Sequence, residues 1–81
     1  MSRTLRVQYF ALLREQAGRS EEQVTTAATT PLELYAELQR RYPFQLTREQ
    51  LKVAVNAEFR DWATPLADGD SVVFIPPVAG G

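Results

Sequence analysis

A single amphipathic helix with marked ends constrains the fold of this 81-residue chain more than any other feature of its sequence. The run Thr30-Pro31-Leu32-Glu33 supplies an N-cap threonine, a proline at the first helical position and a glutamate three residues after the cap. Pro43 ends the helix, because the residue before a proline is disfavoured in the helical region. Four apolar residues then recur along one face at helical spacing: Leu34, Tyr35, Leu38 and Tyr42.

The other segments predict strands, turns and one short helix. Alternating apolar and polar residues predict strands at 5–9 and 51–55, and a weaker strand is expected at 22–26. Residues 11–17 predict a short helix, followed by Gly18 in the position of a helix-ending glycine. The run 71–75 is apolar or β-branched almost throughout, which is typical of a central strand that is covered on both faces.

These elements predict the α+β class, with one main helix packed on one face of a mixed sheet of four to five strands. A turn at 56–58 is expected to be followed by a short return strand that starts at Phe59, and Asp68 and Asp70 are expected to form a turn around Gly69. We expect residues 1–75 to form the domain and residues 76–81 to form an extended C-terminal diglycine tail.

Histidine and cysteine are both absent from the chain. The chain therefore has no imidazole base, no thiolate nucleophile and no ordinary zinc site. Lys52 is the only lysine, and no pattern marks it, or the tyrosines and carboxylates, as catalytic machinery. We predict that the protein is not an enzyme by itself and that it has no catalytic side chain and no metal site.

The balance of nine basic and ten acidic residues leaves a net charge of −1, which argues against a nucleic-acid-binding protein. No apolar run approaches the roughly 20 residues of a membrane helix, and the N-terminal residues lack the apolar region of a signal peptide. We expect a cytoplasmic protein with neither nucleic acid nor membrane as a partner.

The sequence ends in the letters FIPPVAGG. Pro76 and Pro77 each restrict φ and favour an extended exit from the sheet. Gly80 and Gly81 have no Cβ, so they fit a channel that is too narrow for side chains. The carboxylate of Gly81 is ionised at neutral pH and is a poor electrophile, so a partner enzyme has to activate it, for instance as a mixed anhydride with AMP.

The chain resembles the small subunit of molybdopterin synthase, a family of ubiquitin-like sulfur carriers. The resemblance spans essentially the whole chain and is carried by VQYFALLREQAG at 7–18, VAVN at 53–56 and PLADGDSVVFIPPVAGG at 65–81. It implies a ubiquitin-like β-grasp fold. The Phe-x-Pro-Pro-Val-x-Gly-Gly ending is its most discriminating part.

The resemblance also implies a reaction cycle. An E1-like adenylyltransferase activates Gly81 with ATP, and a sulfur donor enzyme completes its conversion to a thiocarboxylate. The tail then enters the active site of the large synthase subunit, in a heterotetramer, and donates sulfur to cyclic pyranopterin monophosphate. No cofactor is bound permanently, since the sulfur is carried covalently. The inserted residues are Pro76, Pro77, Val78, Ala79, Gly80 and Gly81.

Docking to the large subunit is implied for Phe10, Arg14, Phe59 and Ile75. Phe10 falls on the opposite side of the first strand from the core positions, and Ile75 shares one side of the last strand with Val73. Packing in the core remains the alternative for these apolar residues, most of all for Ile75. Tyr35 and Trp62 are expected to pack in the domain rather than to bind a partner.

Three other functions remain open. A sulfur carrier for thiazole synthesis shares the fold and the diglycine, but such carriers are usually shorter between the first two strands and lack the Pro-Pro-Val ending. A ubiquitin-like modifier would be joined to lysines of target proteins. An interaction domain with an inert tail would keep its activity without Gly80 and Gly81, whereas a carrier would lose it.

Overall fold

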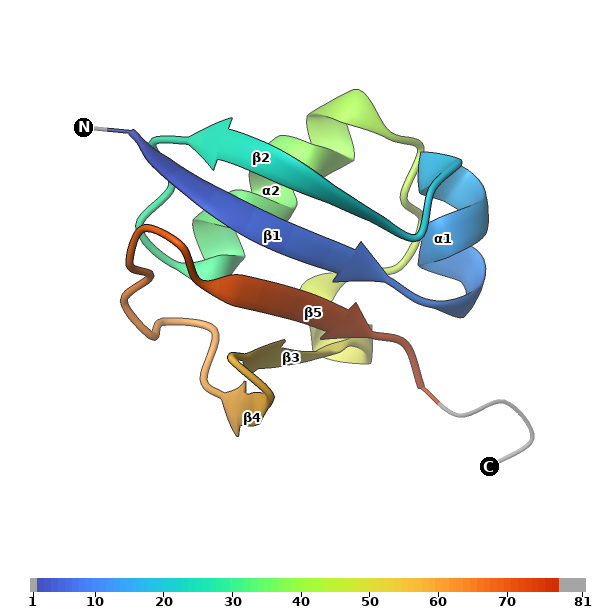
Figure 1. The fold of residues 1–81 in the computed structure, drawn as a ribbon. Coiled ribbons are helices and arrows are strands. Elements are labelled where there is room, and N and C mark those ends of the chain that lie inside the picture. The colour runs from blue at the N-terminus through green and yellow to red at the C-terminus, as the bar shows by residue number, and fades with distance from the viewer. Residues whose placement is uncertain (1, 78–81) are drawn as a thin grey trace.

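The computed structural model describes residues 2–77, and Figure 1 shows their elements in one α+β unit. In chain order, the elements are β1 (Arg3–Tyr9), α1 (Ala11–Ala17), β2 (Glu21–Thr26), α2 (Pro31–Arg41), the 3-10 turn η1 (Arg48–Gln50), β3 (Lys52–Val55), β4 (Glu58–Arg60) and β5 (Ser71–Ile75). The predicted helices and strands are all present, and η1 is the one element that the sequence pattern did not indicate.

The described strands form one five-stranded sheet in the order β2-β1-β5-β3-β4. β1 and β5 run parallel, while the other neighbouring pairs run antiparallel. The main helix α2 lies across one face of this sheet (Figure 1). This is the β-grasp arrangement, so the predicted fold class and the central place of β5 are confirmed.

The start of α2 follows from the residues that cap it. The Thr30 hydroxyl accepts a hydrogen bond from the backbone N–H of Glu33 at 3.2 Å, and the Glu33 carboxylate accepts one from the backbone N–H of Thr29 at 2.7 Å. These bonds satisfy backbone donors that a helix start leaves unpaired. At its other end the helix gives way to extended backbone at Tyr42, immediately before Pro43.

One face of the sheet is buried against the helix layer, and the other face is not. In β5, Val72 and Phe74 are fully buried, while Val73 and Ile75 on the opposite side are only half-buried. The prediction that β5 is covered on both faces is therefore wrong for its outer face. The apolar pattern correctly predicted a strand of hydrophobic side chains. It could not predict that no other element of the described chain covers Val73 and Ile75.

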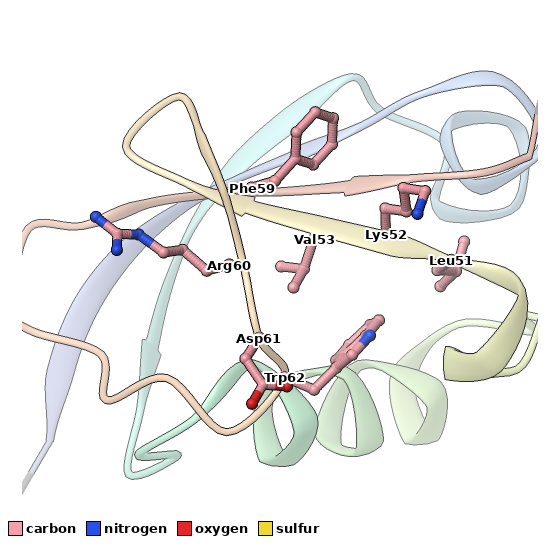
Figure 2. Close-up of a pocket in the computed structure, with 7 residues that line it drawn as sticks. All are labelled: Leu51, Lys52, Val53, Phe59, Arg60, Asp61 and Trp62. Atoms are coloured by element: carbon pink, nitrogen blue, oxygen red, sulfur yellow. The ribbon is translucent and has the colours of Figure 1, made fainter.

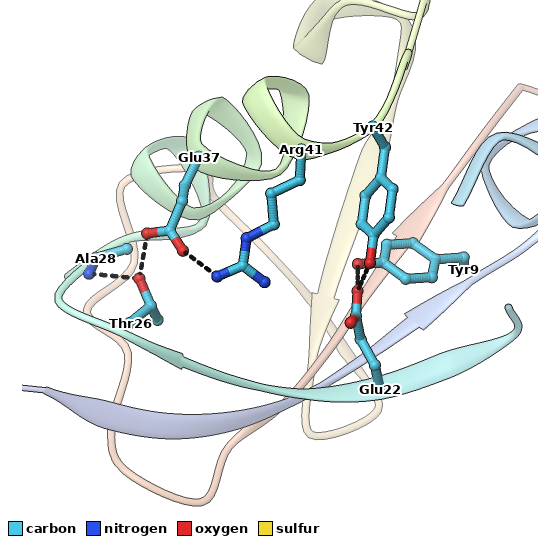
Figure 3. A network of polar contacts seen from close by, with 7 residues as sticks. All are labelled: Tyr9, Glu22, Thr26, Ala28, Glu37, Arg41 and Tyr42. Carbon is cyan, nitrogen blue, oxygen red and sulfur yellow. Dashed lines mark hydrogen bonds and ion pairs between the residues drawn. The ribbon is translucent and has the colours of Figure 1, made fainter. Parts of the chain in front are cut away.

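Polar contacts hold the edge strand β2 against α2 and the segment that follows it (Figure 3). The hydroxyls of Tyr9 and Tyr42 both donate to one carboxylate oxygen of Glu22, at 2.6 and 2.7 Å. Farther along β2, the Thr26 hydroxyl donates to Glu37 on α2 at 2.6 Å. Each contact gives a buried polar group the partner it needs away from water.

Buried tyrosines predict a loss of stability at alkaline pH. Burial raises the pKa of Tyr35 to about 12, and burial with the bond to Glu22 raises the pKa of Tyr9 further. The unfolded tyrosines ionise near pH ~10, so above that pH the unfolded state releases protons first. We expect the free energy of unfolding to hold up to about pH 10 and then to fall by about 1.4 kcal/mol per pH unit for each such tyrosine.

Urea unfolding between neutral and strongly alkaline pH measures this effect. A Tyr35→Phe variant removes one of the titrating groups, so its stability should fall less steeply than that of the unsubstituted protein. An identical slope in the two proteins would contradict the assignment.

The β3–β4 turn contains a position that suits glycine better than the residue present. Asn56 and Ala57 both have positive φ, at 53° and 71°, as a two-residue type I′ hairpin turn requires. An alanine pays a steric cost in this left-handed region that a glycine does not. We expect Ala57→Gly to raise the free energy of unfolding by about 1 kcal/mol, and Ala36→Gly inside α2 to lower it by about the same amount. Urea titration of both variants measures these changes. If both substitutions lowered the free energy of unfolding, the result would contradict the turn geometry.

Candidate functional site

The outer face of the sheet carries a shallow apolar surface. A hollow of about 330 Å³ lies there, and Gln8, Ala57 and Ser71 form part of its lining. The rest of the lining consists of five apolar residues from β3, β4, β5 and the position after β1: Phe10, Ala54, Phe59, Val73 and Ile75. We call these five residues the outer apolar face. Contiguous exposed apolar surface of this kind marks a site of interaction in soluble proteins.

The two phenylalanines of the outer apolar face are the most accessible large apolar residues of the described chain. Phe59 is 69% exposed and Phe10 is 48% exposed. Phe59 is accessible because β4 is a three-residue edge strand in which every residue is exposed. Phe10 leaves β1 in extended backbone just before α1 begins. Core packing is therefore excluded for both residues. Ile75 is half-buried, so its exposure does not decide between core packing and docking.

The structure brings three of the four predicted docking residues to one hollow and leaves the fourth outside it. Phe10, Phe59 and Ile75 share the lining, while Arg14 lies exposed on α1 and does not contribute. Within α1, the Arg14 carbonyl accepts a hydrogen bond at 2.9 Å from the N–H of Gly18, the left-handed residue that ends the helix. The helix-ending role predicted for Gly18 is thus confirmed.

The base of the tail adjoins the outer apolar face. Pro76 and Pro77 line a second hollow, of about 320 Å³, together with Lys52, Phe59 and Ile75. Because Phe59 and Ile75 line both hollows, the chain leaves the sheet at one end of the apolar surface. The predicted tail residues Val78, Ala79, Gly80 and Gly81 lie outside the described residues.

Several residues of this region were not singled out as site residues from the sequence, among them Lys52 and Ala54. Lys52 and Ala54 sit on the outer side of β3, opposite Ile75 and Val73 of β5. The alternation within 51–55 was the available signal, since it separates these two residues from Val53 and Val55. The alternation does not indicate which face of β3 is covered, or which element covers it.

Two acidic residues of the described chain, Asp68 and Asp70, accept hydrogen bonds beside Gly69. Asp70 accepts a hydrogen bond from the backbone N–H of Ala67 at 2.8 Å, and Asp68 accepts one from that of Thr4 at 2.7 Å. Asp70 thus acts as a turn former, as predicted, whereas Asp68 joins the turn to β1; both lie at the end of β5 remote from the tail. Within residues 2–77 no group of three His, Cys, Asp or Glu side chains is placed to hold a metal ion.

Tyr35 and Trp62 pack within the domain, as predicted. Tyr35 is buried, and the Trp62 ring stacks on Phe74 with centroids 5.8 Å apart. Neither α1 nor α2, the helices of the described part of the chain, is long and apolar enough to cross a membrane.

These features define a β-grasp domain with an apolar docking surface beside its C-terminal segment, and comparison with known proteins places it in a family. Residues 7–81 match the ThiS family. The molybdopterin synthase sulfur carrier subunit of Mycobacterium tuberculosis is 37% identical over 78 residues, which cover 93% of this chain and 94% of that protein. The Escherichia coli protein of the same name is 35% identical over 80 residues, covering 95% and 99%.

A solved structure agrees with these relatives. It is a protein–protein complex of subunits 1 and 2 of the molybdopterin-converting factor from Helicobacter pylori. One of its chains is similar to this chain with a TM-score of 0.65 and 30% identity, covering 96% of this chain and 99% of that chain. The chain therefore belongs to the ThiS family, as a relative of the molybdopterin synthase sulfur carrier subunits.

Proposed function

We propose that this protein is the sulfur-carrier subunit of a molybdopterin synthase, and that Gly81 carries the sulfur as a thiocarboxylate. The observation that carries the proposal is the continuity between the outer apolar face and the base of the tail, which share Phe59 and Ile75. A carrier needs this arrangement, because one partner surface has to hold the domain while it receives the tail. The named relatives and the two-subunit complex support the same reading.

In the proposed cycle the chain supplies a carboxylate and its partners supply the catalysis. An E1-like adenylyltransferase joins the Gly81 carboxylate to the α-phosphate of ATP and releases pyrophosphate. A donor enzyme then supplies sulfur at the oxidation level of sulfide, which attacks the acyl carbon, displaces AMP and leaves a thiocarboxylate. ATP is thus a substrate of the activating partner, and this chain holds no resident cofactor.

The charged tail then enters the active site of the large synthase subunit. Pro76 and Pro77 direct its first residues away from the sheet, because proline restricts φ and cannot donate a backbone hydrogen bond. Gly80 and Gly81 add no side-chain bulk where the channel is narrowest. Sulfur passes to cyclic pyranopterin monophosphate, and water hydrolyses the acyl–sulfur bond, so that the tail returns as a carboxylate.

Intact-mass spectrometry tests the proposal. The protein is incubated with ATP, the E1-like partner and a sulfur source, and its mass should rise by the difference between one sulfur and one oxygen atom. Fragmentation should map the change to Gly81. A reaction without ATP is the control, and an unchanged mass with a partner shown to be active on another carrier would overturn the proposal.

A further inference from the structure

Lys52 occupies a position that the apolar contacts leave unexplained. It opens β3 and lies directly opposite Ile75 of β5, the last strand residue before Pro76 and Pro77. Its side chain lines both the hollow at the base of the tail and a larger hollow of about 550 Å³ beside Trp62. In Figure 2, Lys52 and Phe59 point to the outer side of the sheet, while Trp62 lies toward α2.

The charge of Lys52 is not matched by the domain itself. Among residues 2–77, the ion pairs all use arginine: Arg6 with Glu21, Arg19 with Glu22, Arg41 with Glu37, Arg48 with Glu49, and Arg60 with Glu58. Glu49 lines the same hollow as Lys52 but pairs with Arg48 at 3.7 Å. Asp61 borders the larger hollow and forms no ion pair with Lys52 within the described chain.

Docking of a partner changes the surroundings of this ammonium group. A surface that covers Phe59 and Ile75 also removes water from Lys52, which shares a hollow with both. Desolvating an unpaired cation is costly, and the cost is recovered only if the partner places an acceptor of opposite charge beside it. A partner without such a group is rejected, so the lysine acts on specificity as well as on affinity.

We propose that Lys52 is a charge-selecting contact, and that the subunit that accepts the tail presents a carboxylate to it at the mouth of its tail channel. This inference rests on the proposed function, because it takes the large synthase subunit as the partner. It adds a charged contact beside the outer apolar face. The apolar residues hold the domain, and the ion pair sets which partner is held.

Calorimetric titration of the large subunit with variants at this site tests the proposal. Lys52→Glu should weaken binding by roughly 30-fold or more, because two carboxylates would then face each other. Lys52→Met, which keeps an unbranched apolar stem but removes the charge, should weaken binding less. Lys52→Arg should bind the large subunit within about threefold of the unsubstituted protein, because it keeps the positive charge.

Arg40→Glu is the matched control. It makes the same change of net charge at an exposed position on α2, on the opposite side of the sheet. Its binding should equal that of the unsubstituted protein. Raising the salt concentration should weaken binding of the unsubstituted protein more than binding of Lys52→Met, because salt screens the proposed ion pair.

The outcomes separate this inference from the proposed function. If the unsubstituted protein binds and Lys52→Glu binds equally well with an unchanged urea midpoint, the charge contact is refuted and the carrier function stands. If the unsubstituted protein does not bind the large subunit, the proposed function falls and the charge contact falls with it. Restoration of Lys52→Glu binding by an acid-to-lysine change in the large subunit would identify the carboxylate.

Discussion

Deletion of Gly80 and Gly81 is expected to abolish molybdopterin formation by the reconstituted synthase while leaving the folded domain intact. The shortened chain still ends in a carboxylate, on Ala79, but that group falls about 7 Å short of the position that Gly81 reaches in an extended tail. It also carries a methyl side chain into a channel that is proposed to accept none. Both effects act before chemistry begins, so the product should fall to the background of the assay.

The measurement is molybdopterin formation with the large subunit, the E1-like partner, ATP and a sulfur source. An Ala79→Gly variant of full length is the control, because it changes the tail by one methyl group and keeps its reach. The urea midpoint of the deletion variant should match that of the complete protein, since the core of the described domain, from Leu5 to Phe74, is unchanged. A deletion variant that still makes product would show that the tail is inert and would favour the interaction-domain alternative.

Phe59→Asp is expected to weaken binding to the large subunit by about 3 kcal/mol, which is more than 100-fold. Phe59 lines the outer apolar face and the hollow at the tail base, so a partner that covers either one contacts this ring. A carboxylate in its place would remove the apolar contact of the ring and would lose its hydration when the partner docks. Because the ring is already largely exposed, the free energy of unfolding should change by no more than about 1 kcal/mol.

Leu32→Asp is the matched control for Phe59→Asp. Leu32 is another exposed large apolar residue, but it lies in the first turn of α2, on the other side of the sheet. A carboxylate there is compatible with the positive end of the helix dipole. Surface plasmon resonance should show the loss of binding for Phe59→Asp only. Equal losses for the two variants would mean that the outer apolar face is not the docking surface.

Lys52 and Phe59 show which properties of a site residue the local sequence pattern can predict and which it cannot. Phe59 was predicted to follow a turn, and the resemblance to a known family marked it as a docking residue. Its exposure, however, depends on β4 being a three-residue strand at the sheet edge. Lys52 gains its position beside the tail only because β3 pairs with β5 in one particular register. Register between distant strands is a non-local property, so neither fact could be obtained from neighbouring residues alone.

The sequence by itself determined the elements that local chemistry controls. The cap at Thr30 and the stop at Pro43 bound α2, Gly18 ends α1, and the apolar run 71–75 forms the central strand. These outcomes depend on backbone preferences and side-chain periods that act over a few residues.

Only the tertiary structure decided which apolar side chains remain accessible. Val72 and Val73 are identical neighbours in β5, yet one is fully buried against the helix layer and the other is half-exposed on the outer side. The identity of a hydrophobic residue indicates that burial of its side chain is favourable. It does not indicate whether its own chain or a second protein covers that side chain. That distinction arises when α2 packs on one face of the sheet, and it leaves the outer apolar face accessible beside the base of the tail.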